Sequence, residues 1–196
     1  MREFDPAQVA YAETYAWVAY YERDWPALTR LLASLTQNQF GLTEAQTAPA
    51  TALATQAQLA FAPFPDNDVP QATRLQQDFY QYIKRVHPHE AFDPMRAGEL
   101  DVRWWIIHRQ LFAQPENQPL IDAIADLYVE VFRVPREQLM QAATHRAEAM
   151  QFSDRWVREG HAPDSPLIPQ IEAALVKSYQ ALRENVAAPA PPAKAV

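Results

Sequence analysis

Glycine is almost absent from this chain: 3 of its 196 residues are glycine, whereas 17 are proline. Proteins built of strands spend glycine on hairpin turns and bulges, so its scarcity favours helices. Proline is tolerated in the first turn of a helix and disrupts one elsewhere, so these prolines indicate where helices start and stop. Because no useful strand-like alternation occurs either, we expect an all-helical (all-α) protein.

Local signals divide the chain into eight helical segments. Asp5 and Asp93 each precede a proline, the pattern of an N-cap followed by the first helical residue. The sequence TEAQ from Thr43 fits a capping box, and Gly41 and Gly160 are suited to stop helices. The third segment contains a proline at position 49, so its first turns are expected to be irregular. The expected helices cover residues 6–24, 26–39, 43–62, 69–86, 94–112, 119–132, 135–159 and 165–185.

The length fits one domain with a substantial core. We expect residues 1–186 to form a single-domain bundle of about seven to eight helices. The remainder, AAPAPPAKAV at residues 187–196, is an Ala/Pro segment with nothing to bury, so we expect a disordered tail.

Charge and missing residue types narrow the function. The net charge is −7 without a dense Lys/Arg run, so nucleic acid is not an expected partner. The chain has no cysteine, which excludes disulfides, thiolate nucleophiles and cysteine-ligated metals. No signal peptide is apparent and no apolar run of about 18 residues occurs, so we expect a cytoplasmic protein without a membrane segment.

The most crowded stretch is DVRWWIIHRQLF, residues 101–112. At about 100° per residue, apolar side chains cover nearly the whole circumference of this helix. Such a helix is expected at the centre of a bundle, with Trp104 and Trp105 in the core. We expect the aromatic first helix and the long seventh helix to pack against it.

Local partners are available for the polar residues of this stretch. Asp101 can accept a hydrogen bond from the Trp105 indole, and His108 can stack on Trp104. Arg109 can lie over Trp105 in a cation–π contact.

Charged residues also intrude on apolar faces of the first and seventh helices. Burying a charge is costly unless it is paired. We therefore expect an internal network that links some of Glu13, Asp101, Arg109, Arg146 and Asp154.

The abundance of aromatic residues favours a non-catalytic binding module for a small apolar or aromatic ligand, or for a protein partner. The first helix carries aromatic residues around most of its circumference, which suggests a homodimer formed through it. The residues expected to line the ligand site are Trp17, Tyr20, Trp104, Trp105, Trp156, Arg109 and Arg146.

Two alternatives come from other classes. A metal-dependent enzyme would bind a divalent or iron-type metal, as one ion or a pair, through Glu13, Asp101, His108 and His145. The Glu-x-x-His motif of di-iron bundles is absent, however, and no cofactor is otherwise expected. A helix-turn-helix regulator would use the corner within residues 120–143, although its second helix is not clearly basic. The sequence does not decide whether the protein is an enzyme, and it favours binding over catalysis.

Overall fold

The computed structural model describes residues 1–112 and 114–187, and this part of the chain contains eight α-helices and no strand. The prediction of an all-α fold is confirmed. The expected tail at residues 187–196 lies outside the described residues except for Ala187. The helices are α1 (Pro6–Glu22), α2 (Trp25–Phe40), α3 (Glu44–Phe61), α4 (Val69–Val86), α5 (Pro94–Gln110), α6 (Gln118–Phe132), α7 (Arg136–Arg158) and α8 (Leu167–Val186).

Short-range chemistry explains where the helices begin. The carboxylates of Asp5 and Asp93 accept backbone N–H bonds at the starts of α1 and α5, as predicted, and Asp24 and Asp68 do the same for α2 and α4. In all four helices a proline follows within two residues of the aspartate. Because proline fixes φ and has no N–H to satisfy, it suits the first helical turn.

Helix α3 departs from one expectation. It is helical from Glu44 onward, with Pro49 inside it, so the predicted irregular start is wrong. The capping box at Thr43 forms, and Thr43 N–H donates to Gln46 Oε1 at 2.9 Å. Near a capped N-terminus, proline removes a single hydrogen bond from the helix, and the adjacent helices that pack on α3 compensate for it.

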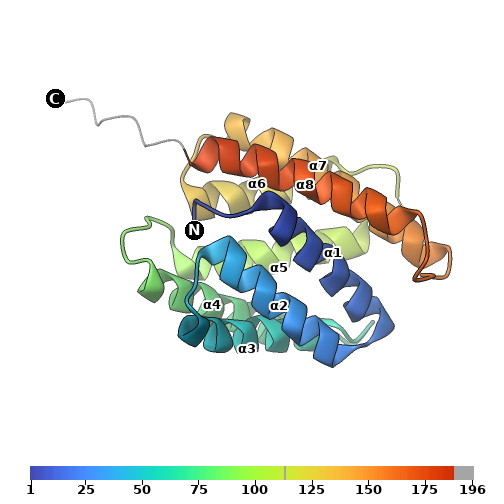
Figure 1. The fold of residues 1–196 in the computed structure, drawn as a ribbon, viewed down its shortest axis with the longest axis horizontal. Helices are drawn as coiled ribbons and strands as arrows, with labels where there is room; N and C mark the ends of the chain where they lie inside the picture. The colour runs from blue at the N-terminus through green and yellow to red at the C-terminus, as the bar shows by residue number, and fades with distance from the viewer. Residues whose placement is uncertain (113, 188–196) are drawn as a thin grey trace.

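The eight helices pack in a closed ring. Each helix packs on the next one in the sequence, and α8 returns to pack on α1. Figure 1 shows α6, α7 and α8 in the upper half of the molecule and α2, α3 and α4 in the lower half. Helix α1 joins the two halves through α2 and α8, and α5 joins them through α4 and α6.

This ring changes the expected position of α5. Its backbone packs against α4 and α6, not mainly against α1 and α7 as the sequence suggested. Trp104 of α5, Tyr20 of α1 and Arg146 of α7 line one cavity inside the ring, so α5 faces α1 and α7 across that cavity.

One core runs through all eight helices, and both tryptophans of α5 belong to it, with Trp104 7% and Trp105 6% exposed. Their predicted burial is confirmed. Within the described part of the chain, none of the helices combines the length and apolar character that crossing a bilayer requires.

Candidate functional site: a cavity inside the helix ring

A cavity of about 590 Å³ lies inside the ring, lined by residues of the first seven helices. Its wall is mostly aromatic and aliphatic. Its charged and amide side chains are those of two acids, three arginines, one histidine and three glutamines: Glu13, Asp101, Arg23, Arg109, Arg146, His108, Gln39, Gln58 and Gln76. Cavities of this size and composition are typical of sites for small molecules.

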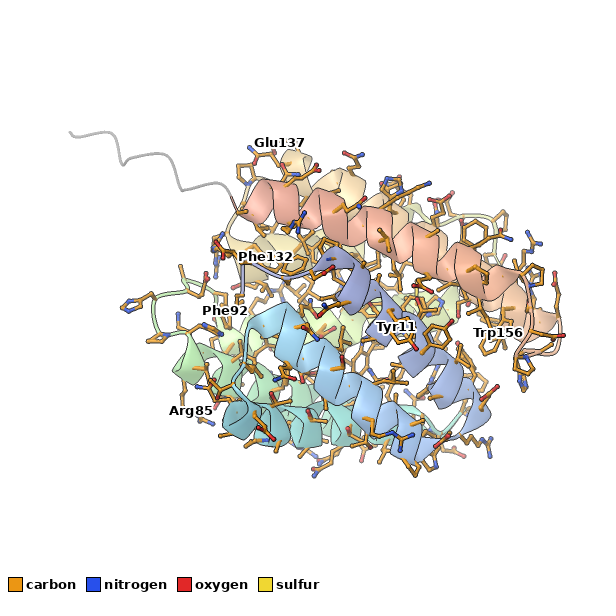
Figure 2. The ribbon with its side chains drawn as sticks, in the orientation of Figure 1. Tyr11, Arg85, Phe92, Phe132, Glu137 and Trp156 are labelled. Carbon is orange, nitrogen blue, oxygen red and sulfur yellow. The ribbon has the colours of Figure 1, made fainter. Side chains whose placement is uncertain are left out.

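The structure brings together most of the residues expected at a ligand site. Six of them line the cavity, whereas the seventh, Trp156, does not. Trp156 is 1% exposed, packs against Tyr21, and donates its indole N–H to the carbonyl of Ala162 at 2.9 Å. Figure 2 shows it near the turn between α7 and α8. The six that line the cavity are Trp17, Tyr20, Trp104, Trp105, Arg109 and Arg146.

A buried ion pair stands in the cavity wall. Glu13 on α1 binds Arg146 on α7 and accepts a hydrogen bond from the Tyr179 hydroxyl of α8. Arg146 also donates to Tyr179 at 3.1 Å and to Tyr128 at 3.3 Å. Burial alone would lower the pKa of Arg146, but Glu13 and the tyrosines outweigh it and raise that pKa. The expected pairing of buried charges is confirmed here.

Asp101 lies nearby on α5 and accepts two hydrogen bonds from neutral donors. Its carboxylate accepts from the indole of Trp104 at 2.8 Å and from the hydroxyl of Tyr80 at 3.1 Å. The prediction that Trp105 would donate a hydrogen bond to Asp101 is wrong. The Trp105 ring packs against Phe61 on α3 instead. Burial raises the pKa of Asp101 to about 6, against the lowering effects of the Trp104 bond and the Arg146 charge.

The raised pKa of Asp101 predicts a specific pH dependence of stability. The folded protein binds this proton more tightly than the unfolded chain does, so stability falls as pH rises from about 4 to about 6 and stays lower above it. Asp101→Asn removes this penalty, and we expect it to raise the free energy of unfolding at pH 8 by on the order of 2 kcal/mol. Urea unfolding of both proteins at pH 8 and pH 5 measures the difference, which shrinks at the lower pH.

The control for this experiment is Glu99→Gln on the same helix, because the Glu99 side chain is 50% exposed. It should leave stability nearly unchanged at both pH values. If Asp101→Asn were less stable than the parent protein at pH 8, the burial penalty assigned to this carboxylate would be refuted.

The remaining polar residues of α5 also have partners on distant helices. His108 Nε2 lies 2.9 Å from an Asp154 carboxylate oxygen on α7, a partner that spacing within α5 did not predict. Arg109 places its guanidinium 4.0 Å from the centre of the Phe61 ring and not over Trp105. In both cases the partner lies on another helix, whereas spacing within α5 indicated the residue four positions away.

Gln76 on α4 was missed by the sequence interpretation. It is 5% exposed, it lines the cavity, and its Oε1 has no hydrogen-bond partner in the structure. Tyr80, which holds Asp101, follows it by one helical turn. The sequence did contain a signal for this residue. Gln76 and Tyr80 are polar side chains four residues apart, beside the apolar stripe that contains Phe79.

The four candidate metal ligands are not brought together. Glu13 is paired with Arg146, and His108 with Asp154. His145 contacts Glu148 at 3.3 Å. Within residues 1–112 and 114–187, no three histidine or acidic side chains form a group that could bind a metal ion. The residues proposed for a metal therefore do not converge on one site.

The corner between α6 and α7 has its basic side chains neutralised. Arg136 at the start of α7 forms ion pairs with Asp122 and Asp126 of α6, and Arg133 forms one with Glu130. These pairings do not favour the helix-turn-helix alternative, which needs positive charge free for phosphates.

The aromatic residues of α1 divide between the inside and the outside of the protein. Trp17, Tyr20 and Tyr21 line the cavity, whereas Tyr11 is 52% exposed on the outer face and its ring lies 4.5 Å from that of Tyr15. Tyr11 gives α1 an exposed aromatic side chain on its outer face, and the homodimer stays a prediction.

A second, open hollow of about 860 Å³ lies at the surface, where the N-terminal residues meet α2 and α8. It is lined mostly by polar side chains such as Glu3, Gln37 and Arg183. The internal cavity is the better candidate site because it is the one that combines aromatic walls with buried polar groups. Comparison of the chain with protein-family models, curated proteins and solved structures finds no match.

Proposed function

We propose that this protein binds a small apolar or aromatic molecule in the cavity inside its helix ring. The observation that carries the proposal is the cavity of about 590 Å³, whose largely apolar wall comes from seven helices and holds a few buried polar groups. A site for an organic molecule needs such a wall for affinity and such groups for orientation.

The two ends of the cavity differ. Near the ends of α1, α3 and α5, exposed aromatic side chains stand at its edge, with Phe64 75% and Phe112 37% exposed. Asp101 and Gln76 lie further along the wall, toward the middle of their helices. Exposed rings at the edge and buried acceptors further along the wall favour a molecule that enters with one polar end first.

Arg109 rigidifies the rim. Its guanidinium lies over the ring of Phe61 and donates to the Phe61 carbonyl at 3.0 Å and to the Tyr20 hydroxyl at 3.4 Å. Burial raises the pKa of Tyr20 above its ordinary value, so this hydroxyl stays neutral. A preformed rim lowers the entropic cost of binding.

Titration with the uncharged fluorophore N-phenyl-1-naphthylamine tests the proposal. We expect saturable binding of one molecule per chain. Ala54→Phe places a ring in the cavity from α3, because Ala54 lines it, and should weaken binding by about tenfold or more. Ala52→Phe is the matched control, because Ala52 lies exposed on the same helix.

The two variants separate cavity binding from adsorption to the surface. Equal binding by Ala54→Phe and Ala52→Phe would contradict the proposal, as would the failure of the parent protein to bind the fluorophore. Circular dichroism of both variants confirms that each remains helical.

A further inference from the structure

Resting on the proposed function, we infer that the natural ligand carries a protonated amine that donates hydrogen bonds to Asp101 and Gln76. The rest of such a ligand is apolar or aromatic and fills the cavity toward the rim. Four features of the wall support this class of ligand.

Asp101 is the acid of the cavity wall that lacks a cationic partner. Glu13 has Arg146, but no ion pair to Asp101 forms within the described part of the chain. Tyr80 and Trp104 supply one hydrogen bond to each of its two carboxylate oxygens. Each oxygen can accept about two, so this carboxylate retains capacity for donors that come from the cavity.

Gln76 supplies a second acceptor on the same wall. Three buried side-chain oxygens in the described residues lack a hydrogen-bond partner, and Gln76 Oε1 is the one whose residue lines the cavity. A buried acceptor without a hydrogen bond destabilises the protein. A ligand that donates a hydrogen bond to it removes this free-energy cost. Helices α4 and α5 approach so closely at Gly98 that a Cβ there would lie 2.8 Å from the carbonyl carbon of Gln76. The backbone of Gln76 therefore lies against α5 at Gly98, three residues before Asp101.

Aromatic rings line the same cavity as these acceptors. Phe40, Phe79, Tyr80 and Trp104 all line the cavity, and the first three form edge-to-face contacts, with ring centres 5.2 Å apart for Phe79 and Tyr80. The faces of such rings attract an ammonium group, and the attraction strengthens where water is excluded. A carboxylate bonded by two aromatic side chains, in a cavity that further rings line, is a suitable site for an amine.

The charges around this part of the wall leave an excess of negative charge. Asp101 feels the positive charge of Arg146 and the negative charge of Glu13. Two carboxylates against one guanidinium leave one negative charge for a ligand to balance. Arg109 is two helical turns from Asp101 and is held by the rim residues Phe61 and Tyr20, so it does not neutralise Asp101.

Three ligands that share a ring but differ in charge test the inference. They are 2-(1-naphthyl)ethylamine, 2-(1-naphthyl)ethanol and 1-naphthaleneacetate, measured by calorimetry at pH 7.5. We expect the amine to bind about tenfold or more tightly than the alcohol, because hydrogen bonds to charged groups exceed neutral ones by this much. The anion should bind most weakly.

Two variants test whether Asp101 and Gln76 cause the preference for the amine over the alcohol. Asp101→Asn should reduce the affinity for the amine about tenfold and leave that for the alcohol within about twofold. Gln76→Met should reduce the amine affinity by a smaller factor, because a neutral acceptor binds less strongly. Glu99→Gln removes an exposed carboxylate from the same helix and should change neither affinity.

The outcomes distinguish the two proposals. If the alcohol or the anion binds as tightly as the amine, the amine inference is overturned and the cavity remains a binding site. An unchanged amine preference in Asp101→Asn overturns the inference equally. If none of the three ligands binds and the neutral fluorophore does not bind either, the proposed function itself fails.

Discussion

Replacing Arg146 with methionine should lower the free energy of unfolding by about 3–5 kcal/mol. The reason is the carboxylate left behind. Glu13 is 3% exposed, and Arg146 is its ionic partner. Without the guanidinium, the Glu13 carboxylate lies buried without its ionic partner. Urea unfolding followed by circular dichroism measures the loss.

A double variant and a control keep this result interpretable. In Glu13→Gln/Arg146→Met neither side chain is charged, so much of the lost stability should return. Arg136→Met on the same helix removes an arginine whose side chain is 38% exposed, and its cost should stay below about 1 kcal/mol. If Arg146→Met costs no more than Arg136→Met, the ion pair does not hold α1 to α7.

Replacing Gly98 with alanine should destabilise the protein by about 2 kcal/mol, opposite in sign to the usual effect in a helix. Within a helix, alanine ordinarily gains about 1 kcal/mol over glycine. Here its Cβ would lie 2.5 Å from the backbone nitrogen of Gln77 and 2.7 Å from the Gln77 Cα. Both atoms are backbone, so α4 would have to move away from α5, at the cost typical of overpacking.

The same substitution should disturb the cavity, because α4 carries Gln76 and Tyr80. We expect Gly98→Ala to weaken the binding of naphthylethylamine as well as to lower the urea midpoint. Increased stability in Gly98→Ala would contradict the close approach of α4 to α5 at Gly98.

The fold class could be predicted because its determinants are local. An aspartate followed by proline, a capping box and the apolar periodicity of a segment act within a few residues, and the predicted starts at Asp5, Thr43 and Asp93 were confirmed. The closure of α8 onto α1 was not predictable, because nothing local encodes which helices become neighbours.

The candidate site was predictable as a set of residues but not as a set of contacts. Spacing correctly marked Glu13 and Arg146 as charges in need of partners. It assigned Asp101 to Trp105, whereas the structure uses Trp104, because both indoles are within reach and packing against Phe61 decides between them. Gly98 matters because the backbone of α4 passes close to it. The sequence of α5 alone does not indicate that α4 lies there.

The position of a bound ligand tests the central claim most directly. A crystal structure of the complex with 2-(1-naphthyl)ethylamine should place the naphthalene inside the helix ring, beside Trp104, with its nitrogen within hydrogen-bonding distance of Asp101. Density for the compound on the outer surface, with the interior of the ring unchanged, would contradict the account.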